Sequence, residues 1–120
     1  MISANDVLQV ISEIHQYSML LIELKNSTTI VIQPAVDGTM SYFKQEGSLK
    51  PTERHALAQR KPRQNQATNL RHLTIEELIG ELEGQTANHI WLEAMGGGRR
   101  EHGFLSISEL KAFLRTNPHG

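Results

Sequence analysis

The chain has 120 residues, of which 38% are hydrophobic and 21% charged, with no cysteine and a formal net charge of −1. This length and composition predict one soluble domain with a packed core rather than a disordered chain. The absence of cysteine excludes thiol nucleophiles, disulfide frameworks and cysteine-based zinc sites. Aromatic residues make up only 5%, too few for a broad stacking platform. No signal peptide, membrane span or cofactor motif is predicted, so we expect a cytoplasmic protein without membrane contact.

The N-terminal third predicts a helix followed by an antiparallel meander. Apolar residues recur at helical spacing over residues 3–16, with Ser3 or Asn5 as the N-cap. A hairpin is expected from strands at 18–24 and 28–32, and residues 39–44 can supply a third strand. Strand 18–24 is apolar on both faces, so we expect helices on one face and a second chain, either a protein partner or a homodimer, on the other.

The middle of the chain, at about residues 48–72, predicts a basic and flexible excursion from the domain. Pro51 suits the first turn of a helix and Pro62 would end one, so a short, weakly packed helix is expected at 52–60. Residues 61–71 are almost wholly polar, which favours a mobile loop.

The C-terminal part predicts a helix, a hairpin and a last helix. Thr74 and Glu77 match a capping box, and the helix that they open is expected to end at Gly84. Strands are expected at 89–95 and 104–105, joined by a turn over 96–103. Ser106 and Glu109 repeat the capping-box pattern and open the last helix.

These elements predict an α+β fold over residues 1–120. The expected architecture is an antiparallel sheet, made of a three-stranded meander plus a second hairpin, with three main helices packed largely on one face. The sequence does not fix the strand order between the two β units.

The charge of the chain is unevenly distributed. Between Lys50 and His72, six basic residues stand against the single acid Glu53, a net charge of +5, so the remaining residues carry −6. Lysine and arginine interleaved with glutamine and asparagine are typical of contacts to phosphates and base edges. A solvated surface loop with no ligand explains the same composition. The candidate nucleic-acid contacts in this segment are Arg54, Arg60, Lys61, Arg63 and Arg71.

A second candidate site is the glycine-rich turn over residues 96–103. Its glycines allow close approach of a ligand, and Arg99 and Arg100 can grip an anion in a bidentate manner. The turn lacks the lysine of a P-loop, and Glu101 stands where the dinucleotide fingerprint needs glycine, so neither nucleotide motif is present. A flexible hairpin tip is the competing interpretation.

The third candidate is a cluster of titratable residues on the C-terminal hairpin. On a strand, His89, Trp91 and Glu93 share one face, and the returning strand could bring His102 close to Glu93. Two histidines and one carboxylate are a known metal-binding set. Exposed polar residues on a wet sheet face explain the pattern equally well, and no metal is predicted.

Three functions follow from these features, in decreasing order of support. The first is a small non-enzymatic accessory or regulatory protein that contacts nucleic acid through the basic segment. The second is a protein-binding adaptor, inhibitor or immunity-type module, with Trp91 and His102 as partner contacts, or a homodimer. The third is a small enzyme that uses the His89, Glu93 and His102 cluster, although no catalytic motif is present.

Overall fold

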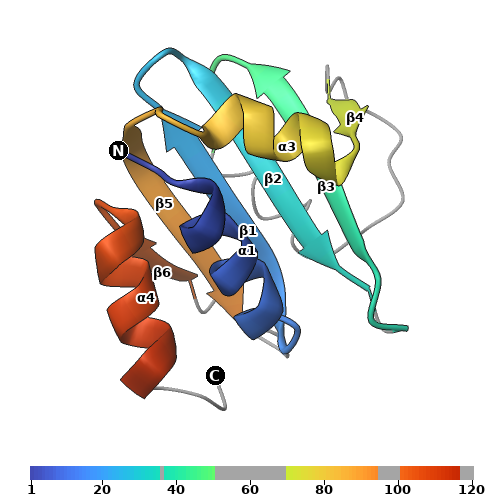
Figure 1. Ribbon diagram of the computed structural model, residues 1–120, viewed down its shortest axis with the longest axis vertical. Helices are drawn as coiled ribbons and strands as arrows, with labels where there is room; N and C mark the ends of the chain where they lie inside the picture. The colour runs from blue at the N-terminus through green and yellow to red at the C-terminus, as the bar shows by residue number, and fades with distance from the viewer. Residues whose placement is uncertain (36, 51–69, 95–100, 117–120) are drawn as a thin grey trace.

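The structure is a computed structural model that describes residues 1–35, 37–50, 70–94 and 101–116. Its six strands form one antiparallel sheet in the order β4-β3-β2-β1-β5-β6, accompanied by three helices (Figure 1). The predicted α+β class and antiparallel sheet are therefore confirmed. The elements are α1 (Ala4–Glu13), β1 (Tyr17–Leu24), β2 (Thr28–Pro34), β3 (Met40–Glu46), β4 (Arg71–Leu73), α3 (Ile75–Leu82), β5 (Ala87–Ala94), β6 (Glu101–Phe104) and α4 (Ile107–Thr116).

Strand β1 lies at the centre of the sheet and pairs with β2 on one side and β5 on the other. Leu21 faces Val31 of β2 and Trp91 of β5, which fixes the register across all three strands. The two edge strands are short: β4 has 3 residues and β6 has 4. Short edges limit unwanted pairing with other chains.

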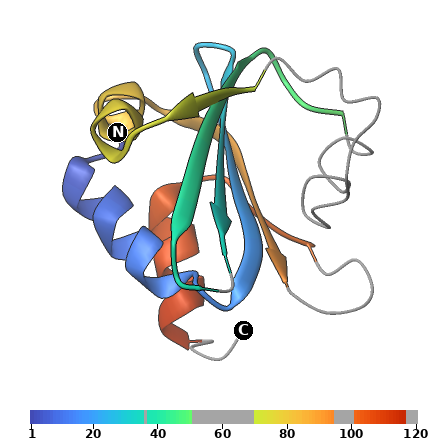
Figure 2. The same ribbon diagram turned by 90° about the vertical axis from the view of Figure 1, so that its right-hand side faces the viewer.

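The three helices lie on the same side of the sheet (Figure 2). We call the sheet surface toward them the helical face and the opposite surface the distal face. The main core fills the space between helices and sheet, because apolar residues of α1, α3 and α4 meet alternate residues of the strands. Its largest buried members are Ile14, Tyr17, Leu20, Ile22, Leu24, Ile30, Ile32, Leu73, Leu78 and Leu82.

The distal face has an apolar cluster of its own. Met19, Leu21 and Val31 are at most 1% exposed and pack with Leu49, while Phe43, Leu70 and Trp91 border the cluster. Because these side chains are already buried within one chain, no second chain is needed to cover them, and a protein partner on this face stays a prediction.

Local signals at the helix ends explain most helix boundaries. The Ser3 side chain accepts a hydrogen bond from the Asp6 amide and so caps α1, which settles the choice between Ser3 and Asn5. Helix α1 ends at Glu13, three residues before the expected end, because the Tyr17 amide closes a turn on the Ile14 carbonyl. Ile14 remains fully buried even so.

Helix α3 has the predicted capping box. The Glu77 amide donates to the Thr74 hydroxyl, while the Glu77 carboxylate accepts from the Thr74 amide. The chain leaves the helix through Gly84, whose φ of +78° suits a residue without Cβ.

Helix α4 begins with a variant of the same motif. The Ser106 hydroxyl accepts from the Glu109 amide, but the Glu109 carboxylate accepts from Leu105 rather than from Ser106 itself.

Two strands differ from the sequence-based expectations. Residues 71–73 form strand β4 rather than the end of a loop, because they pair with β3 from Tyr42 to Lys44. The returning strand of the C-terminal hairpin spans Glu101–Phe104 instead of residues 104–105. The expected helix at 52–60, and most of the expected loop at 61–71, lie outside the described residues.

One buried polar group in the main core is unsatisfied. Tyr17 is 1% exposed, and its hydroxyl has no hydrogen-bond partner among the described residues. Burial also raises the pKa of Tyr17 above the ordinary value of 10.0, because the phenolate would lose its hydration. A buried hydroxyl without a partner lowers stability.

We therefore predict that Tyr17→Phe raises the free energy of unfolding at neutral pH by about 1 kcal/mol, measured by urea denaturation. Tyr42→Phe is the control, because Tyr42 is only partly buried and its hydroxyl is not an unsatisfied atom. Both tyrosines have raised pKa values, so the wild type should lose stability above about pH 10, where the unfolded chain ionises first. Both variants should weaken that alkaline loss. A destabilised Tyr17→Phe would show that the hydroxyl is satisfied.

Candidate functional site

The distal face links the sheet to the predicted basic segment. Leu49 and Leu70 both belong to the distal cluster, and they lie just before and just after residues 51–69. The chain turns onto this face at Gly47, whose φ is +86°. The Gly47 amide donates to the Ser27 carbonyl, and the Thr29 hydroxyl donates to the Gly47 carbonyl, both at 2.6 Å. The two ends of the basic segment are therefore fixed on one surface.

The described part of the chain is strongly acidic. It includes six lysine and arginine residues and twelve aspartate and glutamate residues, a net charge of −6. The undescribed residues hold the remaining charge, +5, mostly within 51–69 and also at Arg99 and Arg100.

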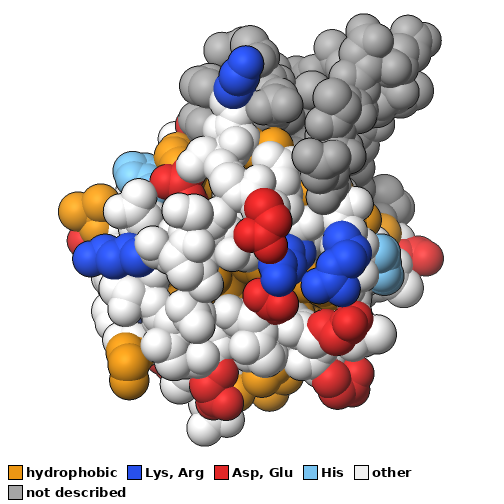
Figure 3. All heavy atoms as spheres, turned by 90° about the horizontal axis from the view of Figure 1, so that it is seen from above, with side chains coloured by type: hydrophobic (Ala, Val, Ile, Leu, Met, Phe, Trp, Pro, Cys, Tyr) orange, Lys and Arg blue, Asp and Glu red, His pale blue; other side chains and the backbone are white. Residues whose placement is uncertain are grey.

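Lys44, Arg71 and Lys111 each form an ion pair within the described part of the chain. Lys44 Nζ lies 2.9 Å from Glu81 Oε2, and this hydrogen bond raises the pKa of Lys44. Lys111 Nζ lies 2.7 Å from Asp6 Oδ1 and lowers the pKa of that carboxyl group. In Figure 3, red acidic side chains lie next to the blue basic side chains near the centre of the view. These pairs reduce the positive charge that the body can offer to a ligand.

Arg71 is the one predicted nucleic-acid contact that the structure describes. It lies on edge strand β4, its side chain is 57% exposed, and its guanidinium is 3.7 Å from the Glu77 carboxylate. An exposed pair at this distance is weak, about 0–1 kcal/mol. Arg71 thus remains accessible to an anion. The other predicted contacts, Arg54, Arg60, Lys61, Arg63, Arg99 and Arg100, lie outside the described residues.

The proposed cluster of His89, Glu93 and His102 does not share one face. His89 and Glu93 lie on the distal face, as expected, but His102 pairs with Leu92 and lies on the helical face. There its ring contacts Phe113 of α4, with centroids 4.7 Å apart. The residue opposite Glu93 is Glu101. His102 and Glu93 lie on opposite faces because His102 pairs with Leu92 rather than with Glu93, and adjacent residues of a strand point to opposite faces.

Within the described residues, no group of three histidine, aspartate or glutamate side chains is placed to hold a metal ion. The two predicted partner contacts, Trp91 and His102, lie on opposite faces of the hairpin. Neither observation supports a catalytic centre built on these residues.

His89 and Trp91 form an aromatic pair on the distal face. Their ring centroids are 4.1 Å apart with an interplanar angle of 35°. Gly103 makes room for this pair, because a Cβ at that position would lie 3.2 Å from His89 Nε2. Carboxylates surround the pair: Glu23 lies opposite His89, and Glu93 and Glu101 face each other further along β5 and β6.

Phe43 and His72 form a second aromatic pair on the same face. Their rings meet edge to face with centroids 5.3 Å apart. Phe43 is partly buried, whereas His72 is exposed. No sequence pattern indicates this pair, because residues 71–73 are too few to show the alternation of a strand.

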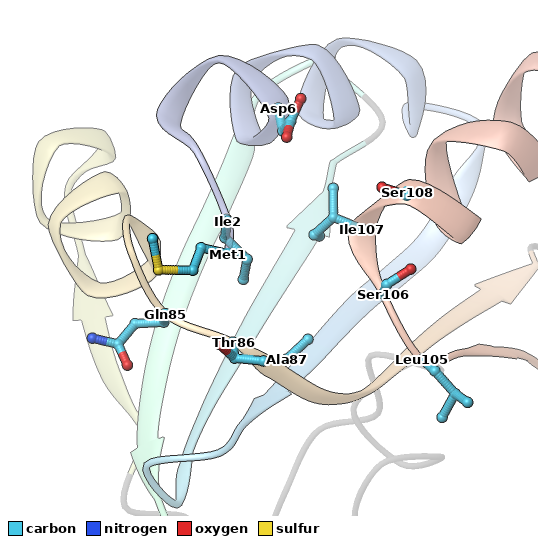
Figure 4. Close-up of a pocket in the computed structure, with 10 residues that line it drawn as sticks. All are labelled: Met1, Ile2, Asp6, Gln85, Thr86, Ala87, Leu105, Ser106, Ile107 and Ser108. Atoms are coloured by element: carbon cyan, nitrogen blue, oxygen red, sulfur yellow. The ribbon is translucent and has the colours of Figure 1, made fainter.

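A small hollow lies between the N-terminus and the start of α4 (Figure 4). Its volume of about 110 Å³ is well below the roughly 300–1,000 Å³ of typical ligand pockets. Two of its polar side chains already have partners, since Ser106 caps α4 and Asp6 binds Lys111. The hollow therefore does not indicate a ligand site.

No known protein family, curated protein or solved structure shows significant similarity to this chain. Among the described residues, no helix is long and apolar enough to cross a membrane.

The aromatic pair at Trp91 gives a direct test of how the faces are assigned. Trp91 is the sole tryptophan, so its fluorescence reports on this site alone. His89→Leu should change the emission of Trp91, because the imidazole ring lies against the indole ring, whereas His102→Leu should leave the emission unchanged. The opposite result would place His102 beside Trp91 and contradict the register of β6.

Proposed function

We propose that this protein is a small non-enzymatic nucleic-acid-binding protein that contacts phosphates through the basic segment at about residues 48–72. The observation that carries the proposal is the division of charge along the chain, with +5 between Lys50 and His72 and −6 over the remaining residues. Arg54, Arg60, Lys61 and Arg63 supply the phosphate contacts, and Arg71 lies at the end of the segment.

The anchoring of the segment supports this proposal. Leu49 and Leu70, which lie just before and just after residues 51–69, both pack at the distal cluster, so the segment is tethered at both ends. A tethered segment loses less conformational freedom on binding than a free tail does. Arg99 and Arg100, between β5 and β6, are proposed as a second contact.

The acidic body restricts where a polyanion can bind. Its carboxylates repel phosphates, and ion pairs occupy Lys44 and Lys111. Phosphate binding is therefore directed to the basic segment, and each contact releases counterions from the nucleic acid. Affinity should fall steeply with salt, and phosphate contacts alone confer no sequence preference.

A protein partner is the second candidate function, in an adaptor, inhibitor or immunity-type role. The acidic charge of the described body favours it, because a basic protein surface would be attracted and steered to such a body. An affinity pull-down with and without nuclease distinguishes the two. A partner retained after nuclease treatment would support the protein-binding function instead.

Matched charge reversals test the leading proposal. Lys61→Glu with Arg63→Glu should weaken binding to a short oligonucleotide by at least tenfold in fluorescence anisotropy at about 50 mM salt. Lys25→Glu with Arg115→Glu changes the net charge equally on the folded body and should change the affinity much less.

The salt dependence is the second readout of the same experiment. Each lost phosphate contact should reduce the slope of log affinity against log salt by about 0.9 for duplex and about 0.7 for single strands. Equal losses in both double variants would show a general charge effect. Absence of wild-type binding to duplex and single strands at low salt would refute the proposal.

A further inference from the structure

The exposed ring of His72 lies where the basic segment joins the sheet. His72 is on edge strand β4, two residues after Leu70, and it faces the distal side opposite Phe43. The edge-to-face contact with Phe43, at 5.3 Å, holds the imidazole in place while leaving it exposed. A fixed, accessible ring on a sheet edge can accept a planar group by stacking.

The charge pattern divides the distal face into two halves, one on β2, β3 and β4, which includes His72, and one on β1, β5 and β6. The carboxylates of the face are Glu23, Glu93 and Glu101, all on β1, β5 and β6. The described distal residues of β2, β3 and β4 include no acidic side chain; they are Thr29, Val31, Gln33, Ser41, Phe43, Gln45 and His72. This half is therefore the part of the face that repels phosphate least.

The carboxylates nearest to this half lie elsewhere and are balanced by cations. Glu77 and Glu81 belong to α3 on the helical side, where they pair with Arg71 and Lys44. Glu46 is exposed at the end of β3, 3.6 Å from the same Lys44. Arg71, directly before His72, brings a guanidinium to the same edge.

We infer that His72, supported by Phe43, is a base-stacking contact for single-stranded nucleic acid. The inference rests on the proposed function and specifies its ligand: phosphates bind the basic segment while an unstacked base lies on the imidazole. Duplexes hide the faces of their bases, so this contact is available only to single strands. Base stacking tolerates any sequence, so the site recognises strandedness rather than sequence.

The test compares single-stranded and duplex oligonucleotides of the same sequence, roughly 16 nucleotides long, by fluorescence anisotropy. Wild-type protein should prefer the single strand. His72→Ala should weaken single-strand binding by about 5- to 100-fold and leave duplex binding unchanged. His72→Tyr keeps a ring and should retain the preference. His89→Ala removes a histidine from the acidic half of the same face and should change binding less than twofold.

The outcomes separate the two proposals. Binding to neither nucleic acid would overturn the proposed function and this inference together. Equal binding to single strand and duplex, with His72→Ala like wild type, would overturn the stacking contact and leave the phosphate contacts standing. Loss of binding in His72→Tyr as well as His72→Ala would show that the histidine, not ring stacking, is required.

Discussion

Strand β1 is buried on both faces, and this constraint determines how the rest of the chain is arranged. Leu20 and Ile22 enter the helical core, while Met19 and Leu21 enter the distal cluster, all at about 1% exposure or less. Neighbouring strands on both sides satisfy the β1 backbone. The described helices cover one face, and Leu49 and Leu70 contribute to covering the other.

That second covering layer also determines the electrostatics. The chain leaves β3 through Gly47, packs Leu49 on the distal cluster, and returns at Leu70 before pairing as β4. The residues between these anchors carry most of the excess positive charge, while the helices and the β5 side of the sheet are acidic. A hydrophobic requirement of β1 thus fixes both ends of a basic segment to one face of an acidic body.

The sequence predicted elements where local physics dominates. Capping residues identified the starts of α1, α3 and α4, and alternation of apolar residues identified β1 and β2. It failed where long-range pairing decides, as in β4, which exists only because β3 offers a partner. The pairing of β6 had the largest effect on the site, since His102 pairs with Leu92 and therefore lies on the helical face. His89 and Glu93 lie on the opposite face, so the predicted cluster of the three residues is divided between the two faces of the sheet.

An acidic body and a basic segment in one chain have opposite effects on a polyanion, and in the proposed function their combination gives direction to binding. A uniformly basic protein would attract nucleic acid over its whole surface, with many equivalent orientations. Here the carboxylates of the distal face, Glu23, Glu93 and Glu101, lie on β1, β5 and β6, while Glu77 and Glu81 of α3 pair with Arg71 and Lys44 on the helical side. Repulsion by the distal carboxylates therefore adds to the attraction of the proposed basic segment in orienting a polyanion. The exposed His72 ring lies on the half of the distal face whose described residues include no acidic side chain.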